Sequence, residues 1–251
     1  MLKSVKPNII IHNMSDEMFA IIAQGAKDLN IDLPPGAGAA FGAYYDFLEK
    51  RGQNVNLTAI SGVEEVACLH FLDSLALLKA ADFKNASVLD IGSGAGFPGV
   101  PLRIAEPAIS LTLLDAAGKR ITFLEELCVN LGIGVTCVKA RAEDAARTGE
   151  FRERFDIVVS RAVARLNILC ELCLPFVRVG GLFIAMKGIN SEGETEDAKN
   201  AIETLGAEFD KFYDYTIQIA DITHRAILIK KTVKTPEKYP RRFSRIQKAT
   251  L

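Results

Sequence analysis

The chain has 251 residues, of which 49% are hydrophobic and 24% are charged, and its formal net charge is −1. This composition is typical of a globular protein with one sizeable core. No apolar run reaches the ~18 residues that a membrane helix needs, and the start, MLKSVKPNIIIHNMSDE, lacks the long apolar region of a signal peptide; we therefore expect a cytoplasmic protein.

Helical periodicity dominates the first third of the chain. The stretch SDEMFAIIAQGAKDLN opens with a Ser-x-Glu start and carries apolar residues at helical spacing, and LPPGAGAA then breaks it. Helices are predicted over 15–30, 39–52 and 63–82, with the polar loop QNVNLTAIS before the last of them. We expect residues 1–84 to form an N-terminal helical extension.

Short β-branched or apolar runs follow, and the first four of them are each followed by a helix-like stretch. This alternation predicts a parallel sheet with right-handed crossovers. Little polar alternation within the strands indicates a sheet that is covered on both faces. Two adjacent strands near the end predict an antiparallel hairpin with ADIT at or near its turn. The strands are expected over 87–92, 110–116, 135–140, 155–162, 180–188, 206–219 and 223–231.

The cysteines are dispersed through apolar segments, and their number, five, is odd. This distribution fits reduced thiols in the core. Cys170 and Cys173 form a C-x-x-C motif. A zinc site of this kind needs a second pair of cysteines, and the chain has none. Helical spacing in NILCELCLPFV favours two buried thiols on one helix, so no metal site is predicted.

A glycine-rich loop, DIGSGAGFPG, follows the first predicted strand, and ligands of open parallel sheets bind at such strand ends. The dinucleotide fingerprint G-x-G-x-x-G is broken because Phe97 occupies its third position, and no P-loop lysine follows. What remains is G-x-G-x-G after Asp90, with Pro98 predicted early in the next helix. This spacing suits a flat zwitterionic ligand, and S-adenosylmethionine is one.

Acids follow the next two strands. Asp115 could accept hydrogen bonds from both ribose hydroxyls of a nucleoside, or it could simply cap the helix after it. Ala142 and Glu143 lie where an adenine edge would be contacted, although Glu143 could equally be a helix N-terminal acid. Asp115 does not separate a methyltransferase from a dehydrogenase, because a dehydrogenase would use the same acid.

The loop after the fourth strand, SRAVARLN, lacks both the [DNS]-P-P-[YFW] motif of amine methylation and the Pro-Cys of cytosine C5 methylation. Ser160, Arg161 and Arg165 stand there instead. Arginine can clamp a phosphate or the O6/N7 edge of guanine through two hydrogen bonds. A surface role for Arg161 is less expected at a strand end that faces the ligand crevice.

The C-terminal segment is basic. From Lys230 to Leu251 there are eight Lys or Arg and one acid, which gives +7 there and −8 for the rest of the chain. This asymmetry indicates a polyanion partner, or else a solvated, disordered basic end. We expect residues 232–251 to form a tail beyond a core of residues 85–231.

Taken together, these motifs resemble the RsmG (GidB) family of 16S ribosomal RNA guanine-N7 methyltransferases. The matching stretches are NVNLTAI, HFLDSLAL, VLDIGSGAGFPGVPLRI, LLDAAGKRITFLEEL, RAEDA, VVSRAVARL and FIAMKG, in this order. The resemblance implies a Rossmann-like α/β fold of the class I methyltransferases, with a seven-stranded sheet. The tail KYPRRFSRIQKATL is similar to family tails but lacks their glycine and second proline.

The resemblance also implies roles for individual residues. Its donor contacts fall on Gly92, Phe97, the Ala142–Glu143 pair and Arg161, with Asp115 as the second-strand acid. Its NLT motif falls on Asn56, and its HFLD motif falls on His70 to Asp73. His70 and Asp73 lie three residues apart on one helix face, so a structural pair is our first interpretation and a general base at His70 is the second.

Guanine N7 needs no deprotonation before it attacks a sulfonium methyl, so alignment is the main task expected of the protein. The expected donor-binding residues are Asp90, Gly92, Gly94, Gly96, Phe97, Asp115, Ala142, Glu143 and Arg161. Arg161 and His70 are the catalytic candidates. The expected RNA contacts are Asn56, Lys119, Arg120, Arg165 and Lys187. The implied partner is 16S ribosomal RNA or the small ribosomal subunit.

Three other functions remain open at this point: an NAD(P)-dependent dehydrogenase, an RNA-binding assembly factor with a vestigial pocket, and a methyltransferase that acts on another substrate. The broken fingerprint at Phe97 argues against the first. The intact glycines and acids argue against the second. The basic tail mildly disfavours a small-molecule or protein substrate.

Overall fold

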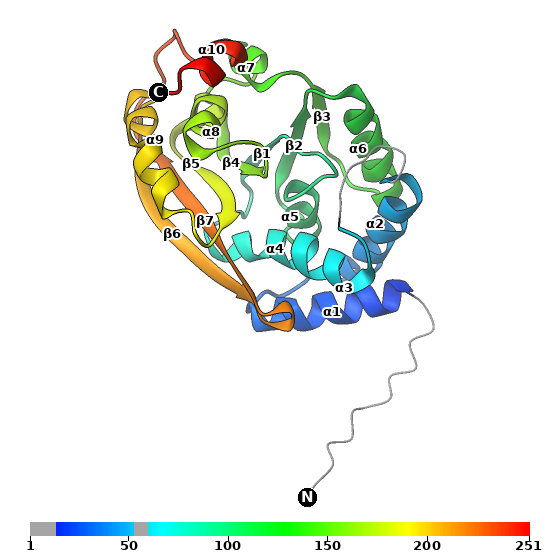
Figure 1. Cartoon of the computed structure of the whole chain (residues 1–251). Coiled ribbons are helices and arrows are strands. Elements are labelled where there is room, and N and C mark those ends of the chain that lie inside the picture. Colours follow the sequence, from blue (N-terminus) through cyan, green and yellow to red (C-terminus); the bar gives the residue numbers. More distant parts are fainter. Residues whose placement is uncertain (1–13, 53–59) are drawn as a thin grey trace, which may run out of the picture.

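The computed structural model describes residues 14–52 and 60–251, and its centre is a seven-stranded sheet (Figure 1). The strand order is β3-β2-β1-β4-β5-β7-β6, in which β7 runs antiparallel to both of its neighbours. The predicted seven-stranded, mostly parallel sheet with a closing antiparallel hairpin is confirmed. The strands are β1 (Ser87–Ile91), β2 (Ser110–Asp115), β3 (Thr136–Lys139), β4 (Phe155–Arg161), β5 (Val177–Gly188), β6 (Ala207–Ile217) and β7 (Ile222–Lys231).

The winding direction of the sheet changes at β1. Asp90 is in register with Leu113 of β2 on one side and with Val159 of β4 on the other. The carboxyl ends of β1, β2 and β4 therefore meet at one edge of the sheet. Open α/β sheets bind their ligands at this point.

Helices cover both faces of the sheet, which explains the continuous apolar strands. Consecutive residues of β1, Val88 and Leu89, are fully buried in two separate cores on opposite faces. The helices of the α/β part are α5 (Gly99–Ala105), α6 (Gly118–Leu131), α7 (Ala142–Ala145), α8 (Leu166–Cys173) and α9 (Glu192–Thr204). Short 3₁₀ turns are η3 (Leu174–Phe176) and η4 (Gln218–Ala220), of which η4 forms the turn of the β6–β7 hairpin near the predicted ADIT.

Two local predictions are settled by these helices. Cys170 and Cys173 are both buried and free on α8, as predicted. Pro98 was expected early in the helix after the glycine loop, but α5 begins at Gly99, so Pro98 directly precedes it. No helix in the described part of the chain is long and apolar enough to cross a membrane.

The N-terminal helices pack on one face of the sheet. They are α1 (Met14–Asp28), α2 (Ala37–Gly52) and a continuous helical run made of α3 (Val63–Val66), η1 (Ala67–Leu72), α4 (Asp73–Leu75) and η2 (Ala76–Lys79). The run matches the helix predicted over 63–82. However, η1 is a π-helix and η2 is a 3₁₀-helix, and the spacing of apolar residues predicted neither. Met18, Tyr44 and Phe71 belong to the same core as Val88.

The C-terminal segment is folded, so the alternative of a solvated, disordered end is wrong. It includes α10 (Phe243–Lys248), lies against α8, and buries Tyr239 and Ile246 (Figure 1). The Arg241 guanidinium and backbone N–H donate to the buried Glu171 carboxylate at 2.6–2.9 Å. Lys231 is fully buried at the start of the segment, and burial lowers its pKa to about 8.

Candidate functional site

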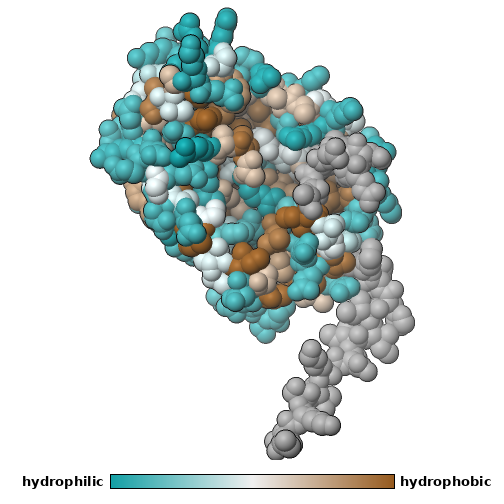
Figure 2. All heavy atoms as spheres, viewed as in Figure 1, coloured by the Kyte–Doolittle hydropathy of each residue, from teal (hydrophilic) through white to brown (hydrophobic). Residues whose placement is uncertain are grey.

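A cavity of about 300 Å³ opens at the carboxyl ends of the central strands, and we name it the glycine-loop pocket. Loops after four strands line it, as the fold rule predicts. Hydrophobic residues gather near the centre of this face of the molecule and hydrophilic residues surround them (Figure 2). Five expected donor-binding positions line this pocket, namely Gly92, Asp115, Ala142, Glu143 and Arg161.

The glycine loop is held against the end of β2 by short hydrogen bonds. The backbone N–H of Gly92 donates to the Leu114 carbonyl at 2.8 Å, and the Gly94 N–H donates to Asp115 Oδ2 at 3.1 Å. The Leu114 N–H in turn donates to the Ser93 hydroxyl at 3.1 Å. A Cβ at Gly92 would lie 2.5 Å from a Val163 methyl, and the φ of +74° is one that residues other than glycine rarely adopt, so both features favour glycine here.

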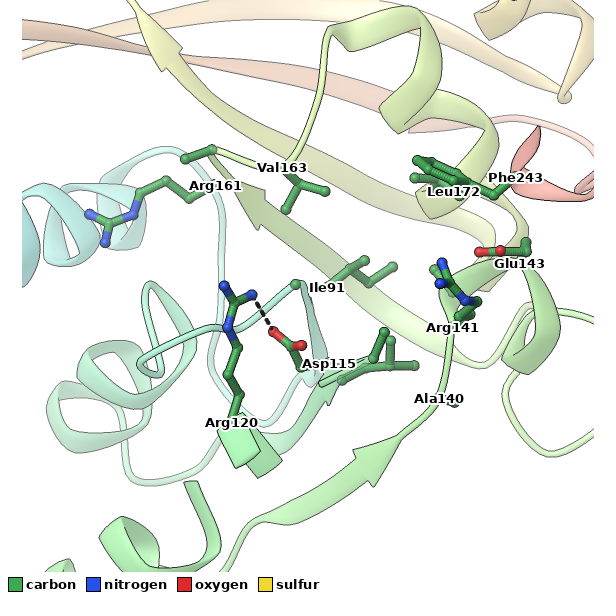
Figure 3. Close-up of a pocket in the computed structure, with 15 residues that line it drawn as sticks. Ile91, Asp115, Arg120, Ala140, Arg141, Glu143, Arg161, Val163, Leu172 and Phe243 are labelled. Atoms are coloured by element: carbon green, nitrogen blue, oxygen red, sulfur yellow. Dashed lines mark hydrogen bonds and ion pairs between the residues drawn. The ribbon is translucent and has the colours of Figure 1, made fainter. Parts of the chain in front are cut away.

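Asp115 lines the pocket but does not cap the following helix, whose N-cap residue is Ala117, so the capping interpretation is wrong and the ribose contact stays a prediction. Its buried carboxylate accepts hydrogen bonds from the Ala117 N–H at 2.8 Å and from Gly94. The Arg120 guanidinium contacts Oδ2 at 3.4 Å, as the dashed line in Figure 3 marks. A carboxylate offers about four lone-pair sites, so Asp115 retains capacity for ribose hydroxyls.

Asp90 lies beneath the pocket and does not line it. Its Oδ2 accepts a hydrogen bond from the Gly99 N–H at 2.9 Å, whereas Oδ1 has no hydrogen-bond partner among the described residues. Complete burial raises the pKa of this carboxyl to about 7. The position supports the loop from below, and a direct contact with a donor stays a prediction.

Phe97 is buried and does not line the pocket either. Its ring stacks on Tyr44 at 5.2 Å and on His70 at 4.5 Å between centroids, and the Arg161 guanidinium lies 5.1 Å from its centroid. Gly94 and Gly96 do not line the pocket either. The structure therefore gives Phe97 a supporting position under His70 and Arg161, rather than one on the pocket wall.

A second cavity of about 580 Å³ adjoins the first, and we name it the histidine pocket because His70 and His224 line it. Arg161 and Ala162 line both cavities, so the two meet at the end of β4. The other walls come from η1, α4, β5, β6 and β7 and from Ile60 before α3. The remaining lining residues are Ile60, Leu69, Asp73, Met186, Lys187, Gly188 and Tyr215.

The Arg161 side chain turns from the glycine loop toward the N-terminal helical run (Figure 3). Its Nη1 donates to the Leu69 carbonyl at 2.9 Å and to Asp73 Oδ2 at 3.1 Å, and its Nη2 lies 3.1 Å from His70 Nδ1. The predicted pair of His70 and Asp73 is therefore bridged by Arg161. Arg161 is not a surface arginine, since its side chain is only 17% exposed.

His70 is not set up to accept a proton. Burial, with a further contribution from the Arg161 guanidinium, lowers the pKa of His70 to about 4. The imidazole is therefore neutral near pH 7. This environment favours the structural interpretation of His70 over a general base.

The expected RNA contacts are scattered. Lys187 reaches the histidine pocket, but its ammonium donates to the Ala164 carbonyl and to Glu194, both at 2.8 Å. Arg120 lines the glycine-loop pocket instead. Arg165 is exposed and pairs with Asp197 at 2.9 Å, and Lys119 is exposed on α6. Asn56 lies outside the described residues.

Several residues that line the two pockets were not predicted from the sequence. Phe243 of the basic tail and Leu172 of α8 close the far side of the glycine-loop pocket (Figure 3). The only sequence signal for Phe243 is an aromatic residue between arginines. Tyr215 and His224 in the histidine pocket had no signal, because they belong to the closing hairpin.

The glycine-loop pocket fits S-adenosylmethionine. It combines a backbone without side chains at Gly92, a carboxylate at Asp115 and apolar walls for a ring at Leu114, Leu172 and Phe243. Its volume lies at the lower end of the range for small-ligand sites. Among the described residues, no cluster of His, Cys, Asp or Glu could hold a metal ion.

Comparisons with solved structures agree on the fold. The [4+2]-cyclase SpnF matches with a TM-score of 0.54 and 13% identity over 81% of this chain and 98% of SpnF. A structure from work on converting a disulfide bond into a thioacetal group during echinomycin biosynthesis matches with a TM-score of 0.51 and 17% identity, over 63% of this chain and 81% of that one. At these identities the similarity concerns the fold alone.

Sequence comparisons are more specific. The family model described as "GidB: rRNA small subunit methyltransferase G" matches residues 38–222. The ribosomal RNA small subunit methyltransferase G of Alkaliphilus oremlandii is 45% identical over 92% of this chain and 98% of its own length. Its counterpart from a Thermoanaerobacter species is 42% identical over 95% of this chain and 100% of its own length. Such matches favour a methyltransferase over a dehydrogenase, and the chain belongs to the GidB family of rRNA small subunit methyltransferases G.

Proposed function

We propose that this chain transfers a methyl group from S-adenosylmethionine to N7 of a guanine in 16S ribosomal RNA. The observation that carries the proposal is the meeting of two pockets at Arg161 in a member of this family. One pocket suits a nucleoside with a zwitterionic tail, and the other is large enough for a purine. A reacting nitrogen and a methyl group could face each other where the pockets join.

The glycine-loop pocket would hold the methyl donor. S-adenosylmethionine supplies an electrophilic methyl group carried on a sulfonium. Asp115 would accept hydrogen bonds from the ribose hydroxyls, and the backbone at Ala142 with the Glu143 carboxylate would contact the adenine edge. Leu172 and Phe243 would pack on the ring and exclude water from it.

The histidine pocket would hold the guanine. Its N7 carries an in-plane lone pair and is nucleophilic without deprotonation, so no residue has to remove a proton. This requirement agrees with the neutral His70, whose pKa is about 4. The residues around the pocket then act by alignment, which is effective when the reacting atoms are held about 3–3.5 Å apart.

Arg161 is the residue best placed to orient the substrate nucleotide. Asp73, Leu69 and His70 hold its guanidinium on one side, and Phe97 supports it from below. These contacts use three of the five N–H groups of a guanidinium, which leaves two for the nucleotide. The target base would have to leave its stack at a cost of a few kcal/mol.

The proposed substrate is 16S ribosomal RNA, either free or within the small ribosomal subunit, and the proposed location is the cytoplasm. Exposed basic residues of the C-terminal segment, Arg242, Arg245 and Lys248, lie close in sequence to Phe243 on the wall of the donor pocket. Such a surface would attract RNA phosphates next to the site.

The test is methyl transfer to small subunits that lack the modification, followed by mass spectrometry of N7-methylguanosine in the digested RNA. Wild-type protein should form this nucleoside, and Arg161→Ala should lower kcat/KM for the RNA about 10- to 100-fold, because charge-assisted hydrogen bonds contribute ~1.5–3 kcal/mol. Arg51→Ala, which removes an exposed ion pair with Glu126, is the matched control and should keep the wild-type rate. Methylation at another atom would refute the proposal, and activity of Arg161→Ala within twofold of wild type would remove Arg161 from the site.

A further inference from the structure

A buried carboxylate lies at the back of the histidine pocket, and the mechanism above uses it only to hold Arg161. Asp73 begins α4 and is 4% exposed. Its Oδ1 accepts hydrogen bonds from the Tyr215 hydroxyl and from His224 Nδ1, both at 2.7 Å. Its Oδ2 accepts the bond from Arg161 at 3.1 Å. Asp73 thus joins three strands of the sheet, β4, β6 and β7.

The bond to Asp73 fixes the orientation of the His224 ring. Because Nδ1 donates to the carboxylate, Nε2 on the opposite side of the ring is directed away from Asp73. The His224 side chain is 30% exposed and lines the histidine pocket together with Arg161. His224 therefore has one nitrogen anchored in the protein and the other available to a ligand in the pocket.

The charges around His224 favour its imidazolium form. The hydrogen bond to Asp73 is the largest cause of a raised pKa of His224, while partial burial and the Arg161 guanidinium oppose it. Tyr215 faces the same carboxylate, and burial raises its pKa well above the ordinary value, so it stays neutral. His70 is neutral, and Lys187 is offset by Glu194.

We propose that Asp73 positions His224 beside Arg161, so that the two side chains together bind one phosphate of the guanosine that is methylated. This inference rests on the proposed function and adds to it a specificity-determining residue, His224, and a positioning residue, Asp73. Two cationic donors match a phosphate, which carries negative charge and several acceptor oxygens.

The base edge is a poorer partner for this pair. Methylation places positive charge on the guanine ring, and a cation held against O6 or N7 would oppose that change. A phosphate on the same nucleotide keeps its negative charge throughout the reaction. The pair should therefore strengthen binding of the RNA and leave the methyl-transfer step nearly unchanged.

This arrangement predicts a specific pH dependence. His224 binds phosphate best when it is protonated, so its contribution should be complete below the pKa of its folded state, which lies above the ordinary 6.5. The contribution should disappear as the pH rises through that value. The KM for RNA should thus increase with pH while kcat changes little.

The experiment compares wild type, His224→Gln and Thr223→Ala in methyl transfer to small subunits at saturating S-adenosylmethionine between pH 6 and pH 9. Glutamine keeps a neutral donor, so His224→Gln should raise the KM roughly tenfold at pH 6 and flatten its pH profile, with kcat unchanged. Thr223 neighbours His224 on β7 and pairs with Thr216 at the surface, so its variant should match wild type. Unchanged binding of S-adenosylhomocysteine and an unchanged unfolding midpoint would verify that the variants are folded.

The outcomes separate this inference from the proposed function. If His224→Gln had the wild-type KM and pH profile, the phosphate contact would be wrong. If it lowered kcat and left the KM unchanged, His224 would act at the base and the phosphate assignment would be overturned. Wild-type protein that does not methylate small-subunit RNA would instead refute the proposed function, and this inference with it. Asp73→Asn should reproduce the flattened KM profile if it folds, because the imidazolium would lose its carboxylate.

Discussion

Gly96 and Gly94 are both glycines of the same loop, but the structure predicts very different results when each is replaced by alanine. Both have positive φ, +104° at Gly96 and +57° at Gly94. A Cβ at Gly94 would have one atom within 4 Å, the Gly92 carbonyl oxygen at 3.8 Å. A Cβ at Gly96 would lie 2.6 Å from the Tyr44 hydroxyl and 2.9 Å from Val100.

The neighbours of Gly96 cannot move away easily. Tyr44 is fully buried, donates a hydrogen bond to the Ala95 carbonyl at 2.6 Å, and packs between Phe71 and Phe97. A non-glycine residue in this backbone region costs about 1–3 kcal/mol, and forcing an extra methyl into a packed core costs about 1–3 kcal/mol more. Gly96→Ala should therefore lower the free energy of unfolding by about 2–6 kcal/mol.

Gly94→Ala has only the backbone penalty, which is about 1–2 kcal/mol for the left-handed region. Gly134→Ala, at a position with open space and ordinary φ, is the control and should stay within about 0.5 kcal/mol of wild type. Equilibrium urea unfolding of the three variants measures these differences. If Gly96→Ala were no less stable than Gly94→Ala, the reasoning that Gly96 is held under Tyr44 would be refuted.

Two further predictions concern the C-terminal segment. Phe243→Ala removes an aromatic wall of the glycine-loop pocket and should weaken binding of S-adenosylhomocysteine roughly 2- to 13-fold, since such contacts contribute about 0.5–1.5 kcal/mol. Calorimetry measures this affinity, and Phe209→Ala on the exposed edge strand is the control. Unchanged affinity in a folded Phe243→Ala variant would contradict the prediction. Replacing the exposed Arg242, Arg245 and Lys248 by glutamine should weaken RNA binding and reduce the slope of log affinity against log salt by about 2–3, without affecting S-adenosylhomocysteine. An unchanged slope would show that these three residues do not contact phosphates. Point substitutions are preferable to deletion, because deletion would also remove Phe243 and the Arg241–Glu171 contact.

Much of the fold follows from local patterns. The apolar runs around Asp90, Asp115 and Arg161 predicted strands that the structure contains, and the ends of these strands do meet at one edge of the sheet. Glycine spacing placed Gly92 correctly on a pocket wall. These predictions succeed because strand periodicity and tight turns depend on neighbouring residues, and because a parallel sheet brings strand ends together by its topology.

Other features depended on contacts between distant residues. The π-helix at η1 has no periodicity signal, and it carries His70 to the Arg161 side chain. Charge composition indicated a basic tail, but not that its Arg241 binds the buried Glu171 or that Phe243 reaches the pocket. The tail folds because its few apolar residues find a partner surface on α8, which composition does not reveal.

By itself, the sequence determined the alternating strands and helices, the glycine loop and the acids at the strand ends, because each depends on residues close together in the chain. Only the tertiary structure decided which side chains share the histidine pocket. Asp73 meets Tyr215 and His224 across separations of 142 and 151 residues, through the antiparallel register of β6 and β7. Such meetings are set by how the packed layers align, and no local spacing encodes that alignment.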